Sequence, residues 1–254
     1  MLRGKKVKMN EKVNFGSKKV NKDEKPELVS KIFSTVSNKY DLMNDAMSFG
    51  LHRLWKEKMC FVSKLQDNET VLDIATGTGD IALKLLNKRK DLNITCLDEN
   101  NNMLQLCKDR LVDHGYIKDI KFINSAIEDA DLIRNYYSLV TIAFGFRNFT
   151  DHSKALSNIY KSILPGGRLV IMEFSTPENK ILKNIFEKYT HLLIPNIGKI
   201  LVNDYESYKY LADSISSYYT VAEVDQLFIE NGFENVRHEL LPGNMVSIHI
   251  GYKC

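Results

Sequence analysis

The segment at residues 70–82, TVLDIATGTGDIA, constrains the fold of this chain more than any other. An apolar run typical of a β-strand leads to Gly77 and Gly79, and apolar residues at helical spacing follow. Glycines let the backbone turn sharply and approach a ligand, and the first turn of a helix offers unpaired N–H groups. The segment therefore predicts a strand, a ligand-binding loop and a helix.

Two aspartates near this loop bear on the kind of ligand. Asp98 lies nineteen residues after Gly79, behind a second strand-like run, where a carboxylate suits a ribose diol. The glycine spacing alone also fits a dinucleotide-binding loop, which is a weak signal by itself. Asp73 would lie poorly beside a pyrophosphate but suits a cationic ligand. An adenosyl sulfonium is such a cation and carries the diol, so the set favours S-adenosylmethionine.

Strand-like and helical patterns alternate along the middle of the chain. The alternation predicts an α/β fold with a doubly wound, largely parallel sheet. A turn at Pro242, Gly243 and Asn244 separates two further strand-like runs, which predicts an antiparallel hairpin. Such a hairpin at the sheet edge favours the methyltransferase variant of the fold. The strands are expected at residues 71–74, 94–97, 121–124, 139–144, 168–174, 233–241 and 245–252.

The charge of the chain is uneven although its formal net value is only +3. Residues 1–22 hold eight lysines and arginines against the single acid Glu11, and we expect them to form a basic, disordered tail. Residues 23–254 should form one domain, with a helical lid inserted at residues 176–222. A mildly acidic body argues against nucleic-acid binding.

The helical stretches outside the alternating core carry two expected breaks. A first helix should begin near Pro26, residues 37–50 should break into an irregular element, and Leu51 should start the next helix. Within the lid, Pro195 is expected to end a helix.

The cysteines and histidines show no spacing typical of a metal site or a disulfide framework. We therefore expect no metal and a reducing compartment. No uninterrupted apolar run approaches the length of about 18 residues that a membrane-spanning helix needs.

Several motifs beyond the glycine loop resemble those of a known family, the ubiquinone/menaquinone biosynthesis C-methyltransferases, which have the class I S-adenosylmethionine-dependent fold. The blocks at residues 39–56 and 145–148 are the most specific to it, and the resemblance spans residues 13–253. The motifs are NFG at 14–16, KYDLMND at 39–45, MSFGLHRLWK at 47–56, GFRN at 145–148, SYKYLADSI at 207–215 and HIGYK at 249–253.

The resemblance implies where the cofactor binds. The family usually has glycine at the position of Thr76 and often serine at the position of Ala143, so this chain departs from the family pattern at both. The expected cofactor-binding residues are Asp73, Gly77, Thr78, Gly79, Asp98, Ser125, Ala126 and Ala143.

The resemblance further implies C-methylation of a reduced polyprenyl quinone, 2-methoxy-6-polyprenyl-1,4-benzoquinol, in ubiquinone biosynthesis. A ring carbon becomes a good nucleophile when a neighbouring phenol loses its proton, so the site needs a group that stabilises phenolate. Arg147 is the candidate for this role, and an ion pair with Asp45 or Glu173 is its structural alternative. Asn148 could orient the substrate hydroxyl. Tyr40 and Asp41 could form the facing wall, with Asp41 or a water as proton acceptor.

Other functions stay open at this point. The alternatives are a demethylmenaquinol methyltransferase, a class I methyltransferase for another small acceptor, and a cofactor-binding assembly subunit. The apolar stretch at residues 189–202 and the basic tail suggest peripheral membrane contact, and a ubiquinone-biosynthesis protein complex is a further expected partner. We expect a mitochondrial location on the matrix side of the inner membrane, with the bacterial cytoplasm as the alternative.

Overall fold

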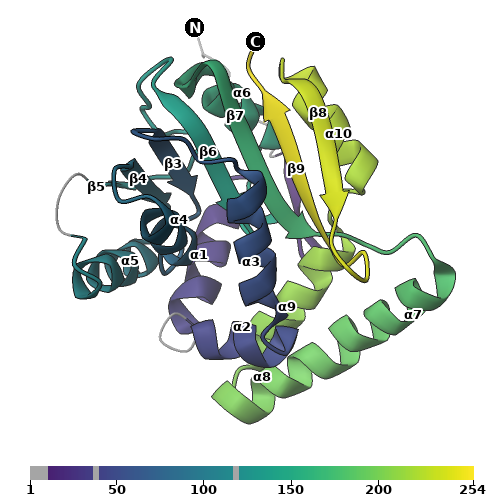
Figure 1. Ribbon diagram of the computed structural model, residues 1–254. Coiled ribbons are helices and arrows are strands. Elements are labelled where there is room, and N and C mark those ends of the chain that lie inside the picture. Colours follow the sequence, from purple (N-terminus) through teal and green to yellow (C-terminus); the bar gives the residue numbers. More distant parts are fainter. Residues whose placement is uncertain (1–10, 37–39, 117–119) are drawn as a thin grey trace, which may run out of the picture.

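The computed structural model describes residues 11–36, 40–116 and 120–254, without the side chains of residues 36, 40–42, 201 and 202. Its centre is a mixed sheet in the order β5-β4-β3-β6-β7-β9-β8 (Figure 1). The first five strands in this order are parallel, and β9 is antiparallel to both of its neighbours. The α/β fold with its edge hairpin is therefore confirmed. The strands are β3 (Thr70–Ile74), β4 (Asn93–Asp98), β5 (Ile120–Asn124), β6 (Tyr137–Ala143), β7 (Ile163–Phe174), β8 (Glu234–Leu240) and β9 (Val246–Tyr252).

Helices cover both faces of this sheet. Val71 faces one apolar layer and its neighbour Leu72 the other, because successive side chains of a strand point to opposite faces. Burial on both sides accounts for the continuous apolar character of the central strands. Residues of α3 (Leu51–Val62), α4 (Asp80–Lys88) and α5 (Asn101–Asp113) pack on the first face, and residues of α6 (His152–Ser162) and α10 (Val221–Glu230) pack on the second.

The N-terminal part of the chain differs from the expected tail. Residues 12–21 form a hairpin of β1 (Lys12–Phe15) and β2 (Lys18–Asn21), so a disordered tail over residues 1–22 is wrong for this part. Tertiary contacts order it, since the Phe15 ring lies 4.4 Å from that of Tyr210 and Ser17 Oγ donates to Asp213 at 2.7 Å. Residues 1–10 lie outside the described chain.

Two helices precede α3. The first, α1 (Lys25–Val36), was expected, but α2 (Tyr40–Ser48) occupies the stretch for which we expected an irregular element. Met43 is buried against Ile194 and Tyr208 of the later helices, and this packing offsets the weak helix propensity of the Asn- and Asp-rich stretch.

The segment between β7 and α10 is helical: α7 (Lys180–Lys188), the π-helical turn η3 (Tyr189–Leu193), α8 (Ile194–Val202) and α9 (Tyr205–Ser216). We expected Pro195 to end a helix, but it stands in the first turn of α8. A residue there needs no N–H for an intrahelical hydrogen bond, so proline is tolerated. Figure 1 shows α7 and α8 as a long arm below the sheet. Among the described residues no helix is long and apolar enough to cross a membrane.

Candidate active site

The carboxyl ends of β3, β4 and β6 meet at one edge of the sheet, the edge at which ligands bind in open α/β folds. The loop after β3 carries Gly77 and Gly79, both with positive φ, of 56° and 80°. A Cβ at Gly79 would lie 2.6 Å from Cys107 Sγ, so only glycine lets α4 begin this close to α5.

Asp98 ends β4 and is 7 % exposed. Its carboxylate accepts hydrogen bonds from the backbone N–H groups of Gly77 at 2.8 Å and Asn100 at 2.9 Å. Each oxygen keeps a further lone pair, which suits a pair of ribose hydroxyls. Burial raises the pKa of Asp98 to about 6. The carboxylate lines a cleft of about 70 Å³ together with Ser125 and Ala126.

Asp73 lies in β3 and is 1 % exposed. Its two oxygens accept from the hydroxyls of Thr76 at 2.6 Å and Thr141 at 2.7 Å. Burial raises the pKa of Asp73 to about 6, and these hydrogen bonds oppose the rise. Thr76, which departs from the family's glycine, thus helps to hold the buried carboxylate.

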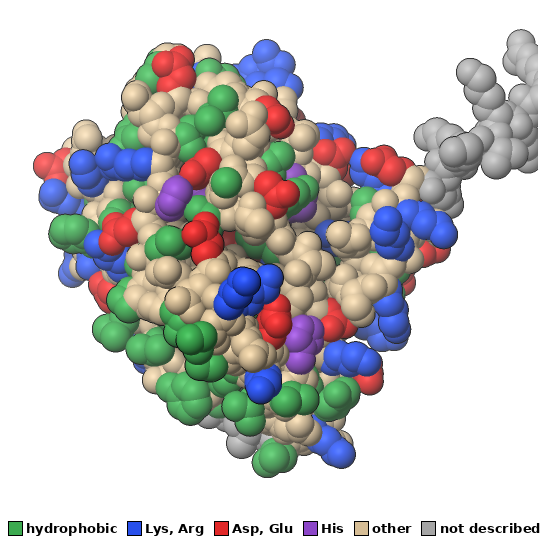
Figure 2. All heavy atoms as spheres, turned by 90° about the vertical axis from the view of Figure 1, so that its right-hand side faces the viewer, with side chains coloured by type: hydrophobic (Ala, Val, Ile, Leu, Met, Phe, Trp, Pro, Cys, Tyr) green, Lys and Arg blue, Asp and Glu red, His purple; other side chains and the backbone are tan. Residues whose placement is uncertain are grey.

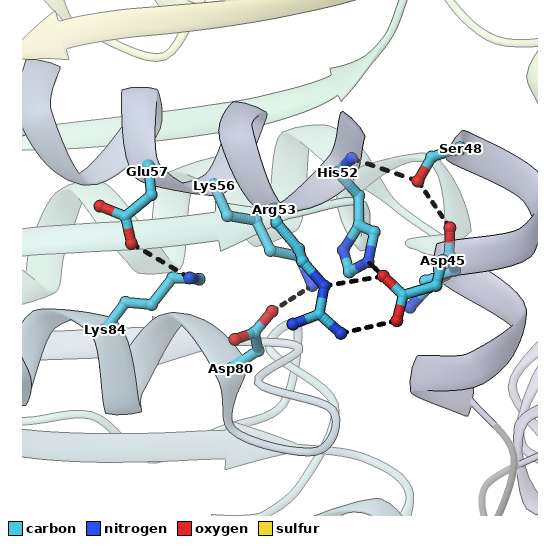
Figure 3. Close-up of polar contacts among 9 residues, drawn as sticks. Asp45, Ser48, His52, Arg53, Lys56, Glu57, Asp80 and Lys84 are labelled. Carbon is cyan, nitrogen blue, oxygen red and sulfur yellow. Dashed lines mark hydrogen bonds and ion pairs between the residues drawn. The ribbon is translucent and has the colours of Figure 1, made fainter. Parts of the chain in front are cut away.

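A second cleft of about 30 Å³ adjoins Asp73 and is also lined by Thr78. It holds an ion pair between Lys56 Nζ of α3 and Asp80 Oδ2 of α4 at 2.7 Å (Figure 3). An anionic and a cationic side chain in one small cleft match the carboxylate and ammonium of an amino acid. The two clefts share the wall residues Ala75, Gly77 and Ala143, so they adjoin each other and suit the adenosyl group and the amino-acid group of one cofactor. The buried carboxylates and the open glycine loop fit S-adenosylmethionine.

Phe144 lies where this cofactor cleft meets a third, larger cavity, and it lines all three spaces. It follows β6 with a positive φ of 58°. Its ring packs 4.8 Å from that of Phe174 and 6.3 Å from that of Trp55. A group transferred from the cofactor into the larger cavity would therefore pass beside Phe144.

The larger cavity has a volume of about 310 Å³ and a mostly apolar wall. Helices α1, α2 and α3 supply one side of it, and the lid helices supply the other. An aromatic ring with an apolar tail fits such a wall. Its apolar lining includes Ile32, Phe33, Met43, Met47, Trp55, Phe174, Ile185, Phe186, Ile194 and Met245.

Arg147, predicted to stabilise phenolate, lines this cavity from η2 (Phe146–Asn148). Its Nη1 lies 3.0 Å from Oε1 of Glu173, a fully buried carboxylate, and it also donates to the carbonyl of Phe144. Its Nε donates to Ser214 Oγ at 3.3 Å. The ion pair with Glu173 that we named as the structural alternative is therefore present, and the guanidinium lies at the cavity as well.

The other predicted catalytic residues lie in different places. Asn148 lines the cofactor cleft rather than the large cavity, and its Oδ1 accepts from the Tyr210 hydroxyl at 3.1 Å. Tyr40 and Asp41 begin α2, but their side chains lie outside the described part of the chain. Their catalytic roles stay predictions.

Sequence reasoning missed the part that α1 plays in the cofactor cleft. Asn100 caps α5, and its amide also donates to the carbonyl of Ser30 at 2.8 Å and to Ser34 Oγ at 2.8 Å. These bonds hold α1 over the cleft, which Val29 and Phe33 line. Asn100, two residues after the strand-end Asp98, was the available signal, since Asn is a typical helix N-cap.

The histidines are not as scattered in space as in sequence. Asp225, His238 and His249 bring potential metal-ligand atoms within 4.8 Å of one another, which spacing along the chain did not reveal. The Asp225 carboxylate lies 2.6 Å from His238 Nδ1 and 2.7 Å from His249 Nδ1, so hydrogen bonds account for the grouping. The cluster belongs to α10, β8 and β9, away from the cofactor cleft.

Comparisons with known proteins agree with this geometry. The ubiE/COQ5 methyltransferase family matches residues 18–253. The chain is 38 % identical over 244 residues to the ubiquinone/menaquinone biosynthesis C-methyltransferase UbiE of Proteus mirabilis, covering 96 % of this chain and 97 % of that one. It is 38 % identical over 247 residues to the UbiE of Francisella tularensis subsp. novicida, covering 97 % and 99 %. A solved S-adenosylmethionine-dependent methyltransferase from Aquifex aeolicus shares the fold, with a TM-score of 0.58, 17 % identity and coverage of 78 % and 89 %.

Proposed function

We propose, because this chain belongs to the ubiE/COQ5 methyltransferase family, that it transfers a methyl group from S-adenosylmethionine to a ring carbon of a reduced polyprenyl quinone. The observation that carries the proposal is that Phe144 lines both clefts that contain the buried carboxylates Asp98 and Asp73 and also lines an apolar cavity of about 310 Å³. The family match over residues 18–253 confirms the resemblance seen in the sequence at the level of the family.

The acceptor we propose is 2-methoxy-6-polyprenyl-1,4-benzoquinol. Demethylmenaquinol is the second candidate, since the names of the UbiE relatives include both ubiquinone and menaquinone. A cavity walled by apolar side chains favours either ring over a charged or strongly polar acceptor.

The residues around the cavity would prepare the ring for methylation. Bound S-adenosylmethionine supplies an electrophilic methyl group on a sulfonium. Asp98 would hold the ribose and Asp73 the positive end of the amino-acid group, which orients the methyl group toward Phe144. The apolar wall excludes water, which strengthens the interaction between a phenolate and the Arg147 guanidinium.

The substrate's polyprenyl tail requires an apolar path out of the cavity. Ile185 of α7 both lines the cavity and is 60 % exposed, so the wall continues onto the surface. Figure 2 shows hydrophobic side chains gathered on the lower part of one face of the molecule. The exposed apolar residues of the lid, which support peripheral membrane contact through α7 and α8, are Ile181, Leu182, Ile185, Leu192, Leu193 and Ile200.

The two UbiE relatives described above, which match this chain over nearly its whole length, are bacterial. They favour our alternative location, the bacterial cytoplasm, and lend no support to the mitochondrial one. A complex with other proteins of quinone biosynthesis remains part of the proposal, because a membrane-bound substrate is passed between enzymes most readily when they lie together.

The experiment that tests the function is mass spectrometry after incubation with methyl-labelled S-adenosylmethionine. The acceptors are a chemically reduced methoxy-substituted prenyl benzoquinone and a demethylnaphthoquinol, with each oxidised quinone as matched control because its ring is not nucleophilic. We expect a labelled methyl group on a ring carbon of the benzoquinol. Transfer only to the naphthoquinol would select the second acceptor. Cofactor binding without transfer to either would favour another acceptor or an assembly subunit.

A further inference from the structure

One cluster of metal-ligand side chains lies apart from the cofactor cleft and the large cavity. Asp225 of α10, His238 of β8 and His249 of β9 each present a ligand atom, and these atoms all lie within 4.8 Å of one another. None of these three residues lines a cleft of the active site. Two imidazoles and a carboxylate form a donor set that suits zinc among the divalent metals.

The fold brings the three side chains to one face of the sheet. His238 and His249 are cross-strand partners in the antiparallel pair β8–β9, so their side chains point to the same side. Ile248 and Ile250 pack in the first apolar layer, which directs His249 between them to the opposite face. Helix α10 packs on that face and supplies Asp225 (Figure 1).

Hydrogen bonds already hold the three side chains in place. Asp225 Oδ2 lies 2.6 Å from His238 Nδ1, and its Oδ1 lies 2.7 Å from His249 Nδ1. Burial raises the pKa of Asp225, but the hydrogen bonds with His249 and His238 outweigh this effect and lower the pKa, so the carboxylate is ionised. Among the described residues no lysine or arginine forms an ion pair with it. The carboxylate therefore has no permanently charged partner.

His249 also makes the outer hydrogen bond that is typical of a metal-ligating histidine. Its Nε2 lies 2.9 Å from Ser247 Oγ, and its side chain is buried. A metal ion at Nδ1 requires the ring proton on Nε2, from which it is donated to the hydroxyl oxygen. Ser247 thus suits the role of a positioning residue, because this bond fixes both the ring and its tautomer.

The distances allow a zinc ion after small side-chain movements. Zinc binds imidazole nitrogen and carboxylate oxygen at about 2.0–2.2 Å, which places tetrahedral ligand atoms about 3.4 Å apart. The hydrogen-bonded pairs are 2.6 and 2.7 Å apart and the whole set spans no more than 4.8 Å, so movements of about 1 Å reach this geometry. The side chains of His238 and Asp225 are 39 % and 22 % exposed, which gives the ion a path from solvent.

We propose that Asp225, His238 and His249 bind a zinc ion that joins α10 to the edge hairpin β8–β9. The ligands are Nδ1 of each imidazole and a carboxylate oxygen, with a water in the fourth position. Each neutral ring moves its proton from Nδ1 to Nε2, so binding involves no redox step and no net release of protons. Most residues of the edge strand β8 are exposed, so few buried contacts hold it and a link to a helix stabilises it. This inference is independent of the proposed function.

Isothermal titration calorimetry with zinc chloride tests the site, on the whole chain without an affinity tag and after treatment with a chelator. We expect one zinc ion per chain. Ser247→Ala removes only the outer hydrogen bond and should weaken binding by about 10- to 100-fold, whereas His238→Gln removes a ligand and should weaken it further. His114→Gln, at an exposed histidine directly after α5, is the matched control and should bind zinc as the wild type does.

Two measurements separate metal binding from folding. With chelator present, His238→Gln should melt close to the wild type, because this side chain is largely solvated. Zinc at a hundred times its Kd should raise the Tm of the wild type by about 5–10 °C and leave that of His238→Gln nearly unchanged. Cobalt(II) in place of zinc should give the visible absorption of a four-coordinate site in the wild type and none in Asp225→Asn.

Either of two results would overturn the proposal. Equal zinc affinity in the wild type and His238→Gln would identify an adventitious ion bound elsewhere. A wild type that binds no zinc would leave the cluster as a hydrogen-bonded contact between α10 and the hairpin. Neither result bears on methyl transfer, which the quinol assay tests separately.

Discussion

At the scale of single residues, two buried carboxylates dominate the cofactor site. Burial raises the pKa values of Asp73 and Asp98 to about 6. A carboxyl whose pKa is higher in the folded state holds its proton more tightly there, so these groups make the free energy of unfolding fall as the pH rises from about 4 to about 6. Cofactor binding should have the opposite dependence, because it uses the ionised forms.

We therefore expect the affinity for S-adenosylmethionine to fall as the pH is lowered through about 6, with protons released on binding near that pH. Asp98→Asn should weaken binding by about ten- to a hundredfold at neutral pH, the value of charge-assisted hydrogen bonds to the ribose. Calorimetry in buffers of different ionisation enthalpy measures both effects. Asp113→Asn at the exposed end of α5 is the control, and equal affinity for Asp98→Asn and wild type would contradict the assignment.

The buried pair of Arg147 and Glu173 supports a second prediction. Glu173→Gln leaves the guanidinium charge without its partner and should lower the free energy of unfolding by about 3–5 kcal/mol in urea denaturation. The double variant Arg147→Met with Glu173→Gln should lose less than the two single variants added together. Strict additivity would mean that the two side chains do not interact.

At the scale of elements, α3 connects the two halves of the site. Residues four apart lie on the same face of a helix, so His52 and Lys56 are neighbours on one face of α3. His52 lies at the substrate cavity, and Lys56 reaches Asp80 at the cofactor cleft. One helix thus lines both the large cavity and the cofactor cleft.

The loops after β3 and β6 also meet closely, and this leads to a prediction about Gly145. A Cβ there would lie 2.4 Å from the Cβ of Ala75, although the φ of Gly145, −108°, suits any residue. Gly145→Ala should cost about 1–3 kcal/mol in the free energy of unfolding and weaken cofactor binding, because Ala75 lines the cleft. Adding Ala75→Gly should restore both, whereas failure of this rescue would show that the contact is not the cause.

At the scale of the whole molecule, the lid gives the cavity its second wall and presents apolar side chains outward. Ile181 is 72 % and Ile200 is 80 % exposed, on α7 and α8. Ile185, on the same helix as Ile181, lines the cavity that needs an exit for an apolar tail, so we expect this arm to rest on the bilayer.

We expect the protein to float with liposomes in a density gradient and the double variant Ile181→Glu with Ile200→Glu to lose most of this binding. Ile229→Glu on α10, which also replaces a largely exposed isoleucine, is the matched control and should bind as the wild type does. Equal flotation of all three proteins would place the membrane contact elsewhere.

The sequence by itself determined the alternating core, the glycine loop, the strand-end carboxylates and, through its motifs, the family. These features are local: periodicity specifies strands and helices, and a pair of glycines or an Asp after a strand-like run is visible in the sequence itself. It also singled out Arg147 as a candidate site residue, but not which of Asp45 and Glu173 it pairs with.

Only the tertiary structure decided which partners these groups have. It paired Arg147 with Glu173, left Nδ1 of His52 unpaired, grouped Asp225 with two histidines and ordered the hairpin at residues 12–21 against α9. It also made residues 40–48 helical by burying Met43. Each outcome depends on contacts between segments far apart in the chain, and the free energy of such contacts outweighs the local propensities that a sequence pattern records.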